Sequence, residues 1–335
     1  MLRKTPKTLL IGCQHLTPST LGLLERFEAT GIDPKSMVLI GKCYSTVEGV
    51  VAAMHSRGMM AHGGSVPVSA GGYQEAHLRD VANLWQEVFI RLQSGDYDRL
   101  VVLDDGGDVI ASMPAHVAVP VVAVEQTTNG LLKLKQKSKL SCPVVSVAGS
   151  AAKREHEAPF IAGAIADALA LRDAVQNVGI VGAGAIGYAC AQKLVARFNA
   201  VVRVYPEPCA DVWKHSVVLG CTGADISPRN GEARSVRYLA SGSSGDFEFN
   251  TLIKGRPHSF SDMQIGWQVV MNGGYPVNFI RTHEMEAPQE ISLTRSLIFE
   301  GANYAQTLFG ARPAIYELPS DVQYNVVNGW KRYSL

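Results

Sequence analysis

A glycine-rich turn near the middle of the chain constrains the fold more than any other feature of the sequence. Gly182, Gly184 and Gly187 form a GxGxxG pattern between a short apolar run, 178–181, and a segment with helical spacing, 188–198. Such glycines let a strand turn tightly into a helix whose N-terminus binds a pyrophosphate. With a strand before it and a helix after it, the pattern favours a dinucleotide-binding turn over a merely tight connection.

Short apolar runs alternate with helical patterns in the first half of the chain. The predicted strands are 8–13, 36–40, 99–103, 121–124 and 144–147, and the predicted helices among them are 20–30, 47–54 and 78–92. Strands that alternate with helices predict a mostly parallel sheet that is covered on both faces. We therefore expect an α/β fold.

The segment after the glycine-rich turn bears on which dinucleotide binds. In nucleotide-binding folds, an acid after the second strand usually accepts hydrogen bonds from the ribose hydroxyls. The second strand is predicted at 201–205, and Glu207 is the nearest acid, although a solvated loop carboxylate explains it equally well. The next apolar run, 216–219, follows so soon that a strand and a helix of the usual fold are expected to be missing. Arg203 lies within the strand, so neither NAD nor NADP is clearly indicated.

Composition and charge exclude several classes of protein. The 335 residues allow two domains, 47% of them are hydrophobic and 18% charged, and the net charge is +1. We expect no nucleic-acid partner, because there is no strong positive charge, and no membrane partner, because no run reaches about eighteen apolar residues. The first apolar run is too short for a signal peptide, and the six cysteines are scattered without a metal-binding pattern. We therefore expect a cytoplasmic protein without a metal site.

Eight short segments occur in an order that matches a known enzyme family. They are HLTPST at 15–20, STVEGVVAAM at 45–54, VLDDGGD at 102–108, VEQTTNG at 124–130, GAGAIG at 182–187, CTG at 221–223, DFE at 246–248 and GYPVN at 274–278. The DDGGD and E-x-TT-x-G segments are the most specific of these. Together the segments resemble the S-adenosylhomocysteine hydrolase family, of which this chain resembles a shortened and divergent member.

The resemblance implies two Rossmann-like, doubly wound parallel-sheet domains, the first of them discontinuous. Residues 1–155 and 286–312 would form the substrate domain, 156–285 a shortened NAD-binding domain, and 313–335 an irregular C-terminal tail. The resemblance further implies bound NAD, a small nucleoside-like substrate, and assembly as a homodimer or homotetramer.

Members of the family use bound NAD to oxidise the ribose 3′-hydroxyl of a nucleoside. The C4′ hydrogen then becomes acidic because it lies α to a ketone; the 5′ substituent leaves, water adds, and the ketone is reduced back. The resemblance implies that His15 is a general acid or base, that Asp105 is catalytic, and that Lys153 helps to deprotonate the 3′-hydroxyl. Without the resemblance, these residues are a polar loop residue, an acidic turn and a surface lysine.

Further contacts follow from the resemblance and from the glycine-rich turn. The substrate contacts are expected at Thr17, Ser19, Gln126 and Glu157. The cofactor contacts are expected at Thr127, Thr128, Gly182, Gly184, Ala185, Ile186, Gly187, Glu207, Thr222 and Asn278.

Departures from the family pattern bear on the substrate. Gln126 replaces a carboxylate that faces the ribose hydroxyls, and Ser19 replaces an acid that recognises the adenine amino group. Glu157 stands where the family has Asp, Tyr205 replaces the ribose-binding acid, and 241–244 lacks the histidine found near the nicotinamide. Polar pockets discriminate strongly through the buried groups that a wrong ligand leaves unpaired. We therefore expect a substrate other than ordinary S-adenosylhomocysteine.

Three functions remain open. The first is an NAD-dependent hydrolase or lyase that makes or breaks a bond at C5′ through transient 3′-oxidation, by hydrolysis, elimination or dehydration. The second is a non-catalytic protein of the same fold that binds NAD or a nucleoside, which the shortened cofactor domain and the missing histidine suggest. The third is an ordinary dehydrogenase with net hydride transfer. We favour the first.

Overall fold

The computed structural model describes residues 6–68, 72–229 and 231–333. The chain divides into two compact units. The first comprises Met1–Ser65, Ala76–Arg154 and Arg281–Leu335, and the second comprises Val66–Glu75 and Glu155–Ile280. Relative to the boundaries expected from the sequence, residues 66–75 belong to the second unit and the C-terminal residues belong to the first.

The first unit is built on a seven-stranded sheet in the order β15-β6-β5-β4-β1-β2-β3. Its strands are β1 (Thr8–Cys13), β2 (Met37–Ile40), β3 (Met60–His62), β4 (Arg99–Asp104), β5 (Val121–Glu125), β6 (Val144–Ser146) and β15 (Ile315–Glu317). All the pairings are parallel. The strand order reverses between β4 and β1, and such a switch point is where open α/β sheets bind their ligands.

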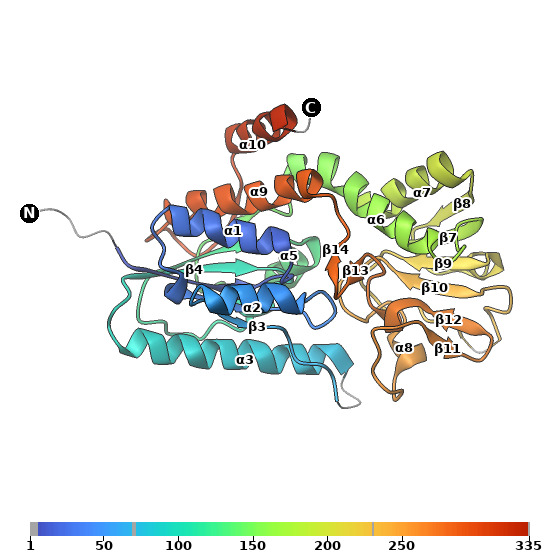
Figure 1. The fold of residues 1–335 in the computed structure, drawn as a ribbon, viewed down its shortest axis with the longest axis horizontal. Helices are drawn as coiled ribbons and strands as arrows, with labels where there is room; N and C mark the ends of the chain where they lie inside the picture. The colour runs from blue at the N-terminus through green and yellow to red at the C-terminus, as the bar shows by residue number, and fades with distance from the viewer. Residues whose placement is uncertain (1–5, 69–71, 230, 334–335) are drawn as a thin grey trace, which may run out of the picture. The chain divides into compact units, whose positions relative to one another are not determined.

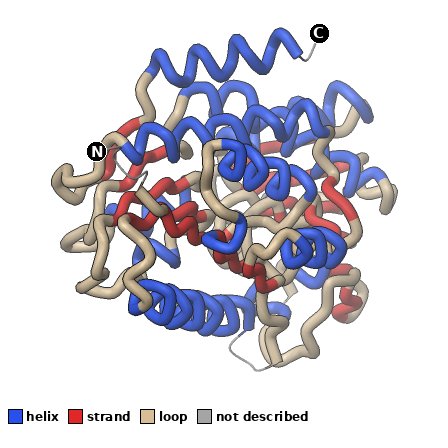
Figure 2. The backbone as a smooth tube through the Cα atoms, turned by 60° about the vertical axis from the view of Figure 1, so that its left-hand side comes forward, coloured by secondary structure: helices blue, strands red, loops and turns tan. Residues whose placement is uncertain are grey.

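Helices cover both faces of this sheet (Figures 1 and 2). Helices α1 (Pro18–Ala29) and α9 (Pro288–Gln306) share one face, where the rings of Phe27 and Phe299 lie 5.0 Å apart. Helix α3 (Gly72–Gln93) covers the other face, and its Val81 and Trp85 join the core beneath β1 and β4. The shorter helices are α2 (Glu48–Ser56), α4 (Asp108–Ala111) and α5 (Thr128–Lys135), with a 3₁₀ turn η1 at Pro34–Ser36.

The C-terminal residues form regular structure, so the expectation of an irregular tail is wrong. Strand β15 pairs with β6, placing Ile315 opposite Val144. Helix α10 (Ser320–Tyr333) then packs on α9, where Trp330 Nε1 donates to the backbone oxygen of Gln289 at 2.7 Å (Figure 2). A three-residue strand is too short to show the alternation of apolar and polar residues, and its partner strand stabilises it.

The second unit contains a six-stranded sheet in the order β11-β12-β10-β9-β7-β8. Its strands are β7 (Asn177–Val181), β8 (Val201–Tyr205), β9 (Val217–Gly220), β10 (Tyr238–Ser241), β11 (Met263–Ile265) and β12 (Gln268–Val270). The sheet is mixed, since β11 is antiparallel to β12 and the other strands run parallel. Helices α6 (Ala158–Ala170) and α7 (Ala185–Phe198) pack on each other. Two Rossmann-like sheets confirm the predicted α/β fold class.

Strand β8 forms the edge of this second sheet. Between β8 and β9 the chain has only the 3₁₀ turn η3 (Val212–Lys214), in place of a helix and a further strand. The remaining short elements are η2 (Lys153–Glu157), α8 (Asn250–Ile253), η4 (Met271–Gly274), β13 (Phe279–Ile280) and β14 (His283–Glu284).

One segment of the second unit comes from far earlier in the chain. The backbone nitrogen of Tyr73 donates to Asp246 Oδ2 at 3.3 Å, and its ring packs edge-on against Phe247 and Tyr275. These aromatic contacts explain why residues 66–75 belong to the second unit, which the sequence did not indicate.

Candidate functional site

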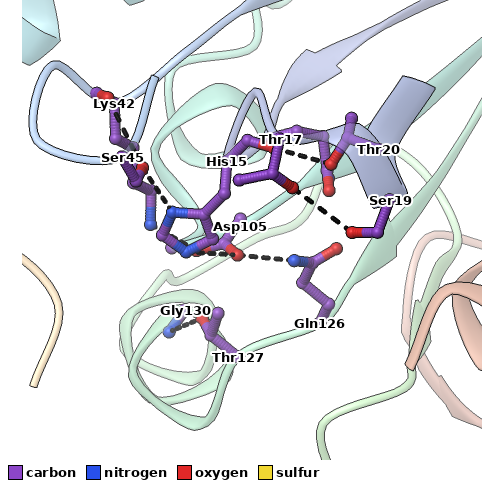
Figure 3. A network of polar contacts seen from close by, with 12 residues as sticks. His15, Thr17, Ser19, Thr20, Lys42, Ser45, Asp105, Gln126, Thr127 and Gly130 are labelled. Atoms are coloured by element: carbon purple, nitrogen blue, oxygen red, sulfur yellow. Dashed lines mark hydrogen bonds and ion pairs between the residues drawn. The ribbon is translucent and has the colours of Figure 1, made fainter. Parts of the chain in front are cut away.

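Polar side chains gather at the carboxyl ends of four strands of the first sheet, on both sides of its switch point (Figure 3). His15 follows β1, Lys42 follows β2, Asp105 follows β4 and Gln126 follows β5. Parallel strands present their carboxyl ends at one edge of the sheet, so residues from separate motifs meet there. The fold thus brings His15, Asp105 and Gln126 together.

The carboxylate of Asp105 is the centre of this cluster. It is only 3% exposed, and it accepts hydrogen bonds from Lys42 Nζ at Oδ1 and from Gln126 Nε2 at Oδ2. His15 Nε2 lies 3.4 Å from Oδ2. Burial by itself would raise the pKa of Asp105, but the charge and hydrogen bond of Lys42 outweigh burial and hold the pKa well below its usual value. Asp105 is therefore charged throughout the neutral range.

Lys42 is a member of the site that the sequence analysis missed. Its side chain is 3% exposed and forms an ion pair with Asp105. Burial alone would lower the pKa of Lys42, but Asp105 raises it well above its ordinary value. The sequence feature that could have indicated Lys42 is its position just after an apolar strand, at the edge of the sheet where ligands bind. Without a visible partner, such a lysine cannot be distinguished in a sequence from a surface residue.

The His15 ring is largely enclosed, with 12% of its side chain exposed, and it is uncharged in the neutral pH range. Burial lowers its pKa to about 3; Lys42 adds to the lowering, whereas Asp105 opposes it. Its Nδ1 lies 2.6 Å from Ser45 Oγ, and the ring meets that of Tyr44 edge-on. Both ring nitrogens therefore have protein neighbours, Ser45 on one side and Asp105 on the other (Figure 3).

Lys153 begins the π-helical turn η2 and reaches the same edge of the sheet. Its Nζ donates to the backbone oxygen of Gln126, and its charge acts on both His15 and Asp105. π-Turns are rare and occur often at functional sites. Glu157 ends this turn as a buried residue of the second unit.

Thr17 and Ser19 lie in a second network, with charged residues from far along the chain. Glu284 accepts from Thr17 Oγ1 at 2.8 Å and from Ser19 Oγ at 2.6 Å, and the backbone nitrogen of Ser19 donates to it at 3.1 Å. Arg295 of α9 donates through Nε to Ser19 Oγ at 2.8 Å. The structure thus supplies a carboxylate beside Ser19 from a position 265 residues away. The sequence analysis missed Glu284 and Arg295, because no local pattern connects them to this loop.

Two further acids lie deeper at the same edge. Asp104 and Glu125 are opposite each other in the β4–β5 register. Burial raises the pKa of Asp104 to about 7 and that of Glu125 well above its ordinary value. Glu125 Oε1 accepts from the backbone nitrogen and hydroxyl of Thr127 at 2.7 and 2.6 Å.

Of the two predicted cofactor threonines, Thr127 has a structural role. Besides bonding to Glu125, its hydroxyl accepts from the backbone nitrogen of Gly130 at 3.0 Å and so caps α5. Thr128 is exposed in the first turn of that helix. Thr128 is therefore the better placed of the two for contact with a ligand.

The glycine-rich turn of the second unit has the geometry of a dinucleotide turn. Gly182 has φ +112°, and a Cβ there would lie 2.5 Å from the backbone oxygen of Cys221. A Cβ on Gly187 would lie 1.9 Å from the oxygen of Gly182, so only glycine permits this contact of helix and turn. Gly184 is exposed and has open space at its Cβ position, and Ala185 and Ile186 open α7. The open side is where a pyrophosphate would approach.

Thr222, the next predicted cofactor contact, follows the neighbouring strand β9. The buried Glu248 accepts from the backbone nitrogens of Thr222 and Gly223 at 2.6 and 2.7 Å, and from the Thr222 hydroxyl at 3.0 Å. Burial raises the pKa of Glu248. The DFE segment therefore holds the CTG loop, a role that the sequence analysis did not assign.

The carboxyl end of β8 differs from a usual ribose site. The Tyr205 hydroxyl lies 2.8 Å from His215 Nε2, and His215 Nδ1 lies 2.6 Å from Asn177 Oδ1. Glu207 is exposed in the loop beyond. Asn278 is buried near the end of β10, where the Val277 backbone nitrogen donates to Ser241 O.

The part of the chain that the structure describes contains neither a metal-binding cluster nor a membrane-spanning helix. Among the residues described, no group of three or more His, Cys, Asp or Glu side chains could hold a metal ion. Within the same ranges, each helix is too short or too polar to span a membrane.

Comparison with known proteins finds relatives without a known function. No family model matches the chain. Two uncharacterized proteins of Mycobacterium tuberculosis, from strains CDC 1551 / Oshkosh and ATCC 25618 / H37Rv, are each 31% identical to it over 90% of this chain. The chain spans 65% of the length of each.

Two solved structures show distant likeness to the chain. Bacillus subtilis dipicolinate synthase, A chain, matches 96% of this chain and 98% of its own, at 10% identity and a TM-score of 0.36. Acinetobacter baumannii MurG matches 97% of this chain and 100% of its own, at 12% identity and a TM-score of 0.29. Both TM-scores lie below 0.5, so neither likeness bears on the function of this chain.

Proposed function

We propose that this chain is an NAD-dependent enzyme of the S-adenosylhomocysteine hydrolase type, acting on a nucleoside or a similar sugar derivative. The proposal rests on one observation above all. His15, Asp105, Gln126 and Lys153 come from four separate segments and meet at the switch point of the first sheet. The reaction would make or break a bond at C5′ by hydrolysis, elimination or dehydration.

The second unit fits a nicotinamide dinucleotide. A side chain would not fit at Gly182 or Gly187, where the backbone is crowded, whereas the space beside Gly184 is open. A pyrophosphate could approach the backbone at that open position. The backbone of Gly184–Ile186 would hold the pyrophosphate, with Thr222 on the adjacent loop. NAD, when bound, would supply reversible oxidation of the ribose hydroxyl carbon.

Unpaired polar atoms at the first sheet support a ligand with hydroxyl groups. Gln126 donates its amide nitrogen to Asp105, whereas its Oε1 is buried and finds no hydrogen-bond partner among the described residues. Gln14 Nε2 is likewise buried and unpaired in that part of the chain. An unsatisfied buried polar atom costs about 1–3 kcal/mol. A ligand hydroxyl that donates to Gln126 Oε1 would remove one such cost.

Lys153 is the proposed group that moves the proton of the substrate hydroxyl. Its ammonium already donates to Gln126 O, so its nitrogen is held beside the amide that would bind this hydroxyl. A lysine acts as a base only after it loses its proton, so in this role Lys153 would pass its proton on before it accepts that of the substrate hydroxyl.

The surroundings of Ser19, one of the expected substrate contacts, differ from a pocket in which a free carboxylate binds the adenine amino group. Ser19 already shares hydrogen bonds with Glu284 and Arg295. A ligand must therefore compete with the Glu284–Arg295 pair, which supports a substrate other than ordinary S-adenosylhomocysteine.

The first test is to denature the purified protein and identify the released small molecules by mass spectrometry. Released NAD, or NAD uptake measured by calorimetry, followed by cofactor reduction with a nucleoside, supports the proposal. An empty protein that takes up no NAD overturns it.

Substitution of Lys153 then separates an enzyme from a binding protein. Lys153→Ala should lose turnover and keep its fold and its NAD content, while Lys139→Ala, an exposed lysine outside the cluster, should keep turnover. A Lys153→Ala protein with full function would instead favour a non-catalytic nucleotide-binding protein. The shortened second unit, in which the 3₁₀ turn η3 replaces a helix and a strand between β8 and β9, favours this second candidate.

A further inference from the structure

We infer that Lys42 is a positioning residue: through Asp105 it fixes the tautomer of His15, with the hydrogen on Nε2 and the lone pair on Nδ1. In this tautomer His15 faces Asp105 as an N–H donor and not as a base. The inference rests on the proposed function only for its consequence in turnover, because the tautomer belongs to the ligand-free protein.

Two donors hold the carboxylate of Asp105. Lys42 Nζ donates to one carboxylate oxygen and Gln126 Nε2 to the other, and the Lys42 and Asp105 side chains are 3% and 4% exposed. The ammonium of Lys42 and the carboxylate of Asp105 stabilise each other's charge in this buried place, so transfer of the proton from Lys42 to Asp105 is not favoured. Asp105 is thus held as a carboxylate, which can only accept hydrogen bonds.

The state of His15 follows from that of its neighbour. An ionised Asp105 facing Nε2 at 3.4 Å favours a hydrogen on this nitrogen. A neutral imidazole carries one N–H, so Nδ1 must be the acceptor. Ser45 Oγ, 2.6 Å from Nδ1, then donates its hydrogen to it, since its contact with the Lys42 backbone oxygen is longer, at 3.4 Å. The donors therefore run from Ser45 to His15 to Asp105 (Figure 3).

The other charges near His15 act in the same direction. Those that face it are Lys42 after β2, Asp105 after β4, Lys153 of η2 and Arg295 of α9. Three are cations and one is an anion, so a positive charge on the ring is disfavoured in addition to the cost of burial. Removing Lys42 would leave Asp105 without its ion-pair partner, and His15 could then take up a proton beside it.

This arrangement assigns His15 a chemical role. The 3.4 Å separation from Asp105 is longer than a normal hydrogen bond, so a ligand oxygen could replace Asp105 as the acceptor from Nε2. A neutral imidazole N–H stabilises negative charge that develops on such an oxygen. His15 would thus act as a hydrogen-bond donor to the substrate, in contrast to the general acid or base expected from the resemblance.

Nitrogen NMR of the labelled, ligand-free protein tests the inference, with His15→Gln used to assign the signal. The native protein should show the Nε2–H tautomer and no titration of His15 between about pH 5 and pH 9. In Lys42→Met, His15 should titrate within this range, and Lys42→Arg should restore the native behaviour. An Nδ1–H tautomer in the native protein, or a Lys42→Met protein whose His15 stays neutral, overturns the inference.

A second variant keeps the test decisive if Lys42→Met does not fold. Ser45→Ala removes the donor to Nδ1 and leaves the ion pair intact, so the Nε2–H tautomer should persist. A switch to Nδ1–H in Ser45→Ala would show that Ser45, and not the Lys42–Asp105 pair, sets the tautomer. These spectra need no cofactor, so the inference can hold even where the release of NAD fails and the proposed function falls.

Discussion

At the scale of single residues, burial and partners decide what identical side chains can do. Asp104 and Asp105 are adjacent in the chain, yet their pKa values move in opposite directions. Burial raises that of Asp104 to about 7, whereas the cations around Asp105 overcome burial and lower its pKa. Only Asp105 is a permanent charge, and the DDGGD segment alone does not distinguish the two.

The pH dependence of stability should reveal Asp104. Its pKa rises on folding from an ordinary 3.8 to about 7, so its contribution is fully present below the lower value and is lost as the pH rises through the upper one. The free energy of unfolding should therefore fall between these pH values, by at most about 4 kcal/mol. Urea unfolding at stepped pH should show a smaller fall in Asp104→Asn.

The exposed Glu207 provides the control for this measurement. Glu207→Gln should have nearly the native free energy of unfolding, because it changes an exposed loop side chain. A curve for Asp104→Asn that runs parallel to the native one would show that Asp104 is charged in the folded protein.

At the scale of elements, the turn from β7 into α7 has the close backbone contacts on which the proposed dinucleotide site depends. It works through two close backbone contacts, Gly182 against Cys221 and Gly187 against Gly182, which leave the exposed side of Gly184 open. Helix α5 of the first unit begins differently, with a side-chain cap from Thr127. The glycine-rich turn depends on local residues, which is why the sequence located it, whereas no helix was expected at α5.

Alanine substitutions in the glycine-rich turn should separate packing from binding. Gly187→Ala places a Cβ 1.9 Å from a backbone oxygen, so the turn must shift, at a cost of about 1–3 kcal/mol or more. At Gly184 the added Cβ meets open space, so Gly184→Ala should have a free energy of unfolding within about 0.5 kcal/mol of the native value. It should nevertheless bind NAD more weakly. Thermal unfolding and calorimetry measure the two effects; equal stability losses would contradict the geometry.

The cap of α5 provides a second test at this scale. Thr127→Ala removes the hydrogen bonds to Gly130 and Glu125 and should cost about 1 kcal/mol of unfolding free energy, with Thr127→Ser largely retaining it. Thr128→Ala should be nearly neutral for stability, because Thr128 is exposed. Chemical denaturation compares the three variants, and a larger loss for Thr128→Ala would refute the capping role of Thr127.

At the scale of the whole molecule, the candidate site depends on chain segments that are distant in sequence. Glu284 and Arg295 reach Ser19 from residues that return to the first unit after the second is complete. Strand β15 closes one edge of the first sheet in the same way. The first unit therefore combines segments that precede and follow the second unit in the chain.

A bound dinucleotide should stabilise the second unit by mass action. NAD at about a hundred times its dissociation constant should add about 2.7 kcal/mol to the unfolding free energy. Hydrogen exchange should then slow around 182–187 and 221–223. Gly187→Ala provides the control, since it should lose both effects, and a stabilisation without protection at these segments would place the binding elsewhere.

The sequence by itself determined the features that depend on neighbours in the chain. Alternating apolar runs gave the α/β class, and the spacing of Gly182, Gly184 and Gly187 gave the strand–turn–helix, because such patterns reflect local backbone geometry. The tertiary structure alone decided that Lys42 pairs with Asp105, that Glu284 meets Ser19, and that 315–317 forms a strand. Ion pairs and edge strands depend on partners brought close only by folding, and burial then sets which of the gathered side chains are charged.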